Sequence, residues 1–255
     1  MFDVVERAEG GHVLTRLQLE LKEKYKFRII LDETWSFGVL GRTGRGLTEA
    51  QNVDPVQVDM IVGSLAGPLC AGGGFCAGAR DVVEHQRLTA ASYTFSAALP
   101  AMLAMAASES LNVLQSNPEI ITQCRENIRL MRAQLDPRSD WVMCTSAPEN
   151  PILLLVLKPD VVKARILTVE DQERLLQECV DESLANGVLI TRLRGRCITN
   201  TSLKGDNWTV QPALKVCLTS GLSKKDVEKA GVTIRHAITK VMTKKTNNKL
   251  GLPAA

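Results

Sequence analysis

The chain has 255 residues, of which 45% are hydrophobic and 23% charged, and its formal net charge is +3. Such values are typical of a globular protein with one large domain or two smaller ones. The weak positive charge, without aromatic residues among the basic ones, argues against nucleic-acid binding. No apolar run approaches the roughly 20 residues of a membrane-spanning helix, and we expect neither such a helix nor a signal peptide here.

The cysteines and histidines do not form a metal-binding or disulfide pattern. The seven cysteines include no Cys-x-x-Cys pair, and the three histidines lie far apart. We therefore expect no metal site and no disulfide framework, and a reducing compartment fits this usage. Cys70 and Cys76 are interpreted as small buried hydrophobic residues.

In chain order, the first half alternates helices and buried strands. Residues 14–26 place leucines among charges, as in an amphipathic helix, and the apolar run 27–33 that follows is typical of a parallel strand buried on both faces. A helix followed by a buried strand is typical of α/β folds, in which the two alternate along the chain. Further strands are predicted at 59–65 and 73–78, and further helices at 81–88, 100–115 and 118–135.

The segment Asp136-Pro137-Arg138-Ser139 breaks this pattern, and we place a domain boundary after residue 138. The second part is predicted to be a small α+β domain, 139–245, followed by a disordered tail at 246–255. Its helices are predicted to begin at Thr168, with Asp171 three residues on, and at Ser223, with Asp226 three residues on. Strands are predicted at 152–158, 187–193 and 213–220, and a loop at 194–210.

Residues 1–138 are interpreted as the carboxy-terminal part of a larger domain. They supply only about three strands before helices take over, fewer than a doubly wound sheet needs. We therefore expect this large domain to be incomplete in the chain.

Asp32 ends the first predicted strand, where ligands collect in open α/β sheets. An aspartate at this position could hold a proton on a pyridine nitrogen. The alternative is a turn or helix cap, which is a common use of an acid after a strand. A glycine-rich stretch, 38–46, follows directly.

Four ordered segments resemble a known family. DETWSFGVLGRTGRGLTE (32–49) is similar to the DEAHSxGxxGxxGRG signature of the α-oxoamine synthases, which use pyridoxal phosphate to join an amino acid to an acyl-CoA. DMIVGSLAGPLCAGGGFCAG (59–78) resembles their DIxxGTxxKxxGxxGGYxAG, TFSAALP (94–100) their FSxxLPP, and ALKVCLTSGLSKKDV (213–227) their LRISLTAxHTxxDI. The resemblance implies an α/β fold of the pyridoxal-phosphate-dependent transferase type, like that of aspartate aminotransferase.

The departures from this pattern concern the family's reactive residues. The lysine that binds the cofactor falls on Gly67, the histidine of DEAH on Trp35, and the arginine of LRIS on Lys215. Imine formation needs an amine, and no lysine occurs between Lys26 and Lys158. We therefore assign no catalytic residue to this chain, and expect Trp35 to fill the vacated cofactor space or to pack at an interface.

Lysine-free members of the family resemble this chain most, and they occur in serine palmitoyltransferase beside a lysine-bearing catalytic subunit. That resemblance implies a heterodimer at the cytosolic face of the endoplasmic reticulum membrane. Its partner subunit would hold pyridoxal 5'-phosphate, and its substrates would be L-serine and palmitoyl-CoA.

Three residues are candidates for contacting the cofactor, and one for contacting the substrate carboxylate. Ser96 is the main candidate, because the family's segment after FS reaches the neighbouring subunit's phosphate. Asp32 and Ser64 are further candidates, and Lys215 is the candidate for the carboxylate. Two alternatives stay open: a self-sufficient oxoamine synthase that uses Lys26 or Lys215, and a truncated fragment without function.

Overall fold

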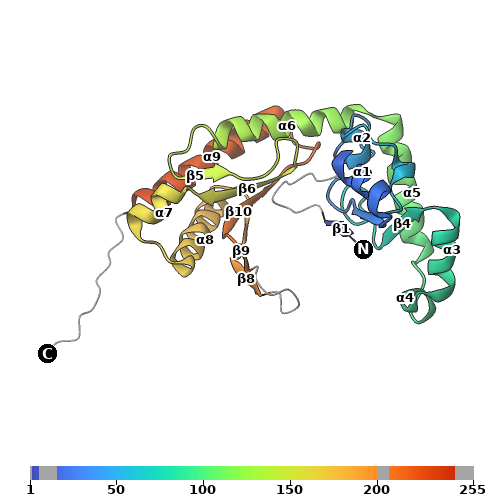
Figure 1. Cartoon of the computed structure of the whole chain (residues 1–255). Helices are drawn as coiled ribbons and strands as arrows, with labels where there is room; N and C mark the ends of the chain where they lie inside the picture. The colour runs from blue at the N-terminus through green and yellow to red at the C-terminus, as the bar shows by residue number, and fades with distance from the viewer. Residues whose placement is uncertain (1, 6–15, 200–206, 245–255) are drawn as a thin grey trace. The chain divides into compact units, whose positions relative to one another are not determined.

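The computed structural model describes residues 2–5, 16–199 and 207–244, and the chain divides into two compact units (Figure 1). Unit 1 comprises Met1–Arg129, Ser146–Ile152 and Leu218–Gly221, and unit 2 comprises Leu130–Thr145, Leu153–Cys217 and Leu222–Ala255. The division falls within helix α6, whereas the sequence predicted a single boundary after residue 138, and that domain assignment stays a prediction. The tail predicted at 246–255 lies outside the described residues.

A four-stranded sheet in the order β1-β2-β3-β4 forms the centre of unit 1. The pairs β1–β2 and β2–β3 are parallel, and β4 is antiparallel to β3. The strands are β1 (Phe2–Val5), β2 (Ile29–Asp32), β3 (Met60–Ser64) and β4 (Gly74–Gly78). Because β2 and β3 run in the same direction, the residues that follow them meet at one edge of the sheet.

The helices of this unit are α1 (Arg16–Tyr25), α2 (Leu47–Ala50), a 3-10 turn (Pro55–Gln57), α3 (Arg80–Thr89), α4 (Ala91–Thr94), α5 (Ala101–Ser116) and α6 (Glu119–Leu135). The first of them lie between the strands, and those from α3 onward follow β4. One hydrophobic core cluster of unit 1 contains Ile29, Leu31, Leu40, Leu47 and Val58. Burial of these apolar side chains holds the 33–58 segment against β2.

Unit 2 contains a second four-stranded sheet, in the order β5-β6-β10-β7. Its central strand β6 has buried residues from Leu153 to Leu157, as expected for a strand covered on both faces. The strands of this unit are β5 (Val142–Cys144), β6 (Ile152–Leu157), β7 (Thr191–Leu193), β8 (Arg196–Thr199), β9 (Asn207–Val210) and β10 (Ala213–Cys217).

Two capped helices pack together in unit 2. The helices of this unit are α7 (Pro159–Arg165), α8 (Val169–Ala185) and α9 (Lys224–Thr243). At the start of α8, Thr168 and Asp171 form a reciprocal capping box, and the Ser223 hydroxyl accepts the N–H of Asp226 at the start of α9. Both predicted helix starts are therefore confirmed.

One predicted loop proved to be partly strand. The segment 194–210 was expected to be irregular because it is polar, yet β8 and β9 pair antiparallel within it. Backbone pairing needs no apolar run, so the composition gave no strand signal. The predicted strand 187–193 is shorter in the structure, where β7 begins at Thr191.

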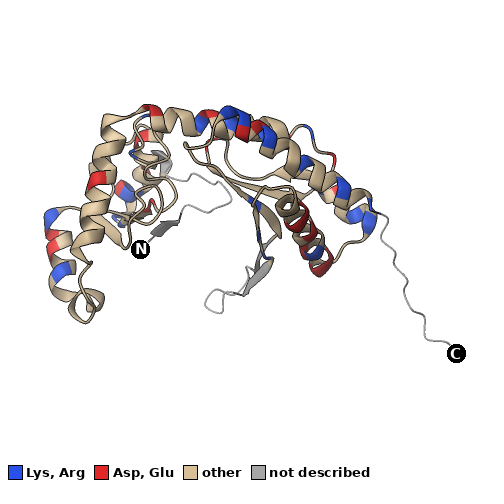
Figure 2. Ribbon diagram, turned by 180° about the vertical axis from the view of Figure 1, so that it is seen from behind, with Lys and Arg blue, Asp and Glu red and all other residues tan. Residues whose placement is uncertain are grey.

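Charge is distributed unevenly between the helices of unit 2. Acidic residues are frequent along α8 and basic ones along α9, as the colours of the ribbon in Figure 2 show. One pair joins them, Lys240 to Glu182 at 2.7 Å. Within the residues that the structure describes, none of the helices combines the length and apolarity needed to cross a bilayer.

Candidate functional site

Asp32 and Glu33 end strand β2 and take different roles. The Asp32 carboxylate accepts the backbone N–H of Thr34 at 2.9 Å, which is the contact of a turn-forming aspartate. Glu33 is only 1% exposed, and its backbone N–H continues the sheet by donating to the Val62 carbonyl at 2.7 Å. The acid at the strand end predicted from sequence thus makes a local turn contact, and its neighbour is the buried one.

The Glu33 carboxylate holds the glycine-rich segment against the sheet. It accepts the N–H of Leu47 with both oxygens, at 3.0 and 2.8 Å, and also the Ser36 hydroxyl. Gly46, at φ +88, lies so close that any Cβ there would overlap this carboxylate. The sequence analysis did not identify Glu33 as the residue that anchors this segment. A glutamate at the end of a strand, followed by Gly44-Arg45-Gly46, was a usable signal for it.

Glu49 organises the rest of the glycine-rich segment. Its carboxylate accepts the Thr43 N–H, the Thr43 hydroxyl and the Arg45 N–H at 2.8 to 3.1 Å. Burial alone would raise the pKa of Glu49, but these hydrogen bonds outweigh it and hold the pKa below its usual value. Hydrogen bonds to the carboxylates of Glu33 and Glu49 therefore stabilise the glycine-rich segment.

Gly67 lies in the loop between β3 and β4. Leu65 donates to the Gly73 carbonyl at 3.0 Å, and a turn closes where Cys70 donates to the Gly67 carbonyl at 3.1 Å. A Cβ built on Gly67 would meet no heavy atom within 4 Å. The position thus opens into free space and could accept a larger side chain without a clash.

That space belongs to a cavity of about 620 Å³, which we call the Gly67 pocket. All residues that line it belong to unit 1, among them Trp35, Ser64, Gly67, Leu114, Ile121 and Leu218. Trp35 lines the pocket and stays 45% exposed, and the expectation that it fills the cofactor space or packs at an interface stays a prediction. The parallel strands β2 and β3 explain why Trp35 and Ser64 meet here.

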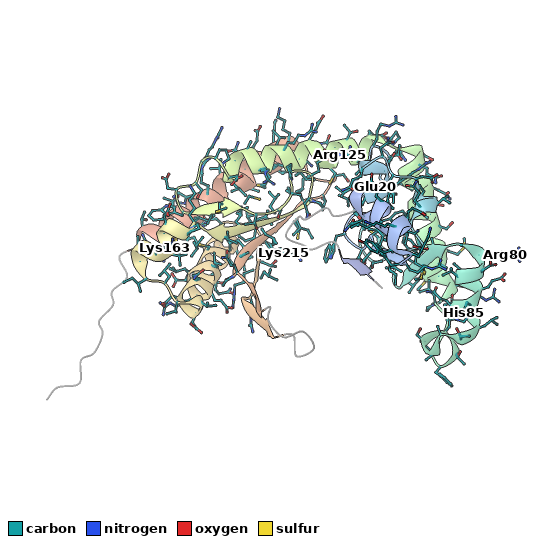
Figure 3. All side chains as sticks on the ribbon, in the orientation of Figure 1. Glu20, Arg80, His85, Arg125, Lys163 and Lys215 are labelled. Atoms are coloured by element: carbon teal, nitrogen blue, oxygen red, sulfur yellow. The ribbon has the colours of Figure 1, made fainter. Side chains whose placement is uncertain are left out.

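Two of the other candidates, Asp32 and Ser96, do not line this pocket, and the third belongs to unit 2. Asp32 is not among its lining residues, and Ser96 is exposed in the segment between α4 and α5. Lys215 lies on β10 in unit 2 (Figure 3). Of the positions named from sequence, therefore, Trp35, Ser64 and Gly67 share one cavity of unit 1, and Asp32 and Ser96 are not among its lining residues.

The cysteine prediction needs correction. Cys70 lines the Gly67 pocket and is exposed, and Cys76 is half-buried. The turn after Gly67 puts Cys70 at φ +50 at the surface, which its hydrophobic neighbours in sequence did not reveal. In the described part of the chain, no three His, Cys, Asp or Glu side chains are grouped so as to hold a metal ion.

The Gly67 pocket does not fit a covalently bound pyridoxal phosphate. That cofactor needs an amine for its aldehyde, donors for its phosphate and an acid near its ring nitrogen. Among the described residues that line the pocket, none is Lys, Arg, His, Asp or Glu. Lys26 precedes the amino end of β2, whereas Trp35, Ser64 and Gly67 lie at or after the carboxyl ends of β2 and β3.

Comparison with known proteins places these features in a family. Residues 12–234 match the model of aminotransferase class I and II. Serine palmitoyltransferase 1 of Dictyostelium discoideum is 34% identical over 88% of the chain, which covers 46% of that protein. Long chain base biosynthesis protein 1 of Arabidopsis thaliana is 32% identical over 89% of the chain, covering 44% of that protein. The chain thus spans about half the length of these relatives.

Solved structures share the fold. Serine palmitoyltransferase of Sphingomonas wittichii superposes with a TM-score of 0.69 at 20% identity, over 88% of this chain and 50% of that one. The 8-amino-7-oxononanoate synthase of Francisella tularensis has a TM-score of 0.61 at 20% identity, over 87% and 58%. The α/β fold expected from sequence is confirmed.

Proposed function

The chain belongs to the aminotransferase class I and II family, and we propose on that premise that it acts as the non-catalytic subunit of a serine C-palmitoyltransferase. The complex condenses L-serine with palmitoyl-CoA, releases CoA and carbon dioxide, and forms 3-ketodihydrosphingosine for sphingolipid synthesis. The likeness to two proteins named for this activity and for long-chain-base biosynthesis supports the proposal.

One observation supports the non-catalytic role. Gly67 stands where the resemblance puts the family's lysine, and it opens into a pocket whose described lining residues are uncharged. Without an amine, the chain cannot form an imine at this position. Pyridoxal 5'-phosphate is therefore held by a lysine-bearing partner subunit.

The partner is proposed to dock beside Ser96. Four exposed apolar side chains surround Ser96 in sequence: Tyr93, Phe95, Leu99 and Met102. Exposed apolar clusters of this kind mark interaction sites. The Ser96 hydroxyl has only a long hydrogen bond, 3.5 Å to the Ala97 carbonyl, which leaves it able to turn towards the partner's cofactor phosphate.

The remaining candidates have lesser roles in this proposal. Ser64 and Asp32 support the loop at the strand ends, with Asp32 acting through its contact to Thr34. Lys215 is the candidate for contacting the carboxylate of serine. The heterodimer is placed at the cytosolic face of the endoplasmic reticulum membrane, as the family resemblance implies.

Co-purification with a lysine-bearing homologue tests the proposal. We expect serine-dependent release of CoA from the mixture and none from this chain alone. Borohydride reduction in the presence of pyridoxal phosphate should label the partner and leave this chain unlabelled. A pyridoxyl group trapped on this chain, or serine-dependent CoA release by the chain alone, would overturn the proposal.

Ser96→Ala in the mixture tests the docking residue. The expected result is weaker retention of pyridoxal phosphate by the heterodimer, measured by dialysis and absorbance, with the heterodimer still assembled. Ser116→Ala, at an exposed serine at the end of α5, serves as the matched control and should retain the cofactor as the unmodified protein does.

A further inference from the structure

The Gly67 pocket has walls that are mainly aliphatic. Leu114 comes from α5, Ile120 and Ile121 from α6, and Ile152 and Leu218 from two short segments that return to unit 1. Its volume of about 620 Å³ lies within the range of roughly 300–1,000 Å³ that is usual for small-molecule sites. The cavity is therefore large enough for a ligand and offers it chiefly apolar contacts.

Several polar atoms around the pocket are already engaged. The Ser64 hydroxyl accepts the Ala66 N–H at 3.1 Å, and the Thr219 carbonyl accepts the Asn127 amide at 2.9 Å. The Leu218 N–H donates to the Pro151 carbonyl at 2.9 Å. A charged ligand group would find no countercharge among the described lining residues, and its burial would be unfavourable.

Two thiols face this apolar space. Cys70 is exposed and Cys124 is half-buried, and both line the pocket. Burial raises the pKa of the Cys124 thiol, although the nearby Arg125 partly opposes the effect. Cys124 is thus the more buried of the two thiols, while Cys70 is accessible to a reagent from outside.

We propose that the Gly67 pocket binds an uncharged hydrocarbon chain in place of pyridoxal phosphate. The hydrocarbon lies against the aliphatic wall and covers Cys70, and any polar head group stays in solvent. The inference goes beyond the function proposed above and does not depend on it, because it rests on the lining of one cavity within unit 1.

If a hydrocarbon binds in this way, its affinity for the pocket should depend on the number of its methylene groups. Each methylene group that leaves water strengthens binding by roughly fourfold. The affinity of a series of straight-chain alcohols should therefore rise steeply with length until the pocket is filled. Hydrogen-bonded or ionic recognition would show no such trend.

Alkylation of individual cysteines provides the measurement. The full chain is treated with N-ethylmaleimide, and modification of each cysteine is followed by peptide mass spectrometry in the presence of 1-butanol, 1-hexanol, 1-octanol or 1-decanol below their solubility limits. We expect decanol to slow modification of Cys70 at concentrations at least tenfold below those needed for hexanol. Cys217, exposed in unit 2, is the internal control and should react at an unchanged rate.

Variants at Gly67 make the test specific to the pocket. Gly67→Phe places a ring in the open space and should abolish protection by decanol, whereas Gly67→Ala leaves room and should preserve it. Equal circular dichroism spectra and melting temperatures establish that both variants are folded. If Gly67→Phe does not fold, the alcohol series on the unmodified chain decides alone.

Three results would overturn the proposal: no protection of Cys70 by decanol, protection independent of chain length, or equal protection by pyridoxal phosphate. None of these measurements involves a partner subunit or enzymatic turnover. Failure of the pocket proposal is thereby distinguishable from failure of the proposed function.

Discussion

Both carboxylate oxygens of Glu33 accept a hydrogen bond from the backbone N–H of Leu47, 14 residues further along the chain. This contact anchors the glycine-rich segment to the end of β2, next to the loop that supplies Trp35 to the Gly67 pocket. A buried carboxylate is stable only when such donors surround it. Glu33 is therefore central to the stability of unit 1.

Glu33→Gln is expected to lower the free energy of unfolding by about 2 kcal/mol, because hydrogen bonds to a charged acceptor are replaced by weaker ones and one amide group faces a donor. Urea unfolding followed by circular dichroism measures the change. Glu126→Gln, at an exposed position on α6, is the control and should change stability by less than about 0.5 kcal/mol. Equal midpoints for the two variants would contradict the role assigned to Glu33.

Gly46→Ala should be strongly destabilising and Gly67→Ala should not. Gly46 has φ +88 and touches the Glu33 carboxylate, so an added methyl group meets both backbone strain, about 1–2 kcal/mol, and a clash. Gly67 has open space around it, so alanine there is expected to be neutral or to stabilise by up to about 1 kcal/mol. Thermal melts of the two variants compare the effects directly. Similar losses in both would refute the packing described for Gly46.

Asp59 should contribute to stability in a pH-dependent way. Its carboxylate accepts the Ile29 N–H at 2.8 Å and the Arg28 guanidinium at 3.0 Å, and it lies 2.8 Å from the Lys22 ammonium. Burial opposes ionisation, but these donors outweigh it and hold the pKa below its ordinary value of 3.8. A lowered folded pKa means that the contribution is present above pH 3.8 and is lost as the pH falls through the folded value.

Asp59→Asn is therefore expected to unfold at lower urea concentration than the unmodified chain at pH 7, with the difference shrinking below pH 4. Asp81→Asn, at an exposed position on α3, is the matched control and should differ little from the unmodified chain at either pH. A difference for Asp59→Asn that is constant from pH 7 to pH 3 would contradict the prediction.

Cys179 should resist alkylation in the folded chain. It is 1% exposed, and burial, reinforced by the charge of Glu178, raises the pKa of its thiol to about 12. Since the thiolate is the reactive form, iodoacetamide at pH 8 is expected to modify Cys217 and to leave Cys179 unmodified until urea unfolds the chain. Rapid modification of Cys179 in the native chain would disagree with its burial.

The same raised pKa predicts a loss of stability in alkali. A thiol with a folded pKa above its ordinary value of 9.0 stabilises the fold fully below pH 9, and this contribution is lost as the pH rises towards 12. Cys179→Ala should flatten that part of the stability profile, as measured by urea unfolding between pH 8 and pH 11. If the free energy of unfolding of Cys179→Ala falls between pH 8 and pH 11 as steeply as that of the unmodified chain, other groups cause the loss of stability.

Phe95→Asp should weaken association with the proposed lysine-bearing partner. Phe95 is 87% exposed next to Ser96, and a charge there would have to be buried at the proposed interface. We expect at least a tenfold loss of affinity in an analytical pull-down, with an unchanged melting temperature of the chain alone. Val56→Asp, also at a highly exposed apolar residue of unit 1, is the control and should bind normally. Equal affinities for the two variants would place the interface elsewhere.

The sequence alone predicted local features well. Thr168 and Ser223 were identified as helix caps because a capping hydroxyl and an acid three residues later interact within one turn. The helix predicted at 118–135 is α6, Glu119–Leu135, and the apolar runs at 27–33 and 152–158 contain β2 and β6. In each case the deciding interactions lie within a few residues, and a linear pattern can show them.

By itself, then, the sequence determined the α/β fold and the helix starts at Thr168 and Ser223, and its resemblance to the family predicted that Gly67 stands at the family's lysine position. Only the tertiary structure decided that Trp35, Ser64 and Gly67 line one uncharged cavity while Asp32 does not, and that Cys70 is exposed. It also revealed Glu33 as the buried anchor and the β8–β9 pair in a polar segment. These features depend on contacts between residues distant in sequence and on the direction in which strands end, and residue types alone do not specify either.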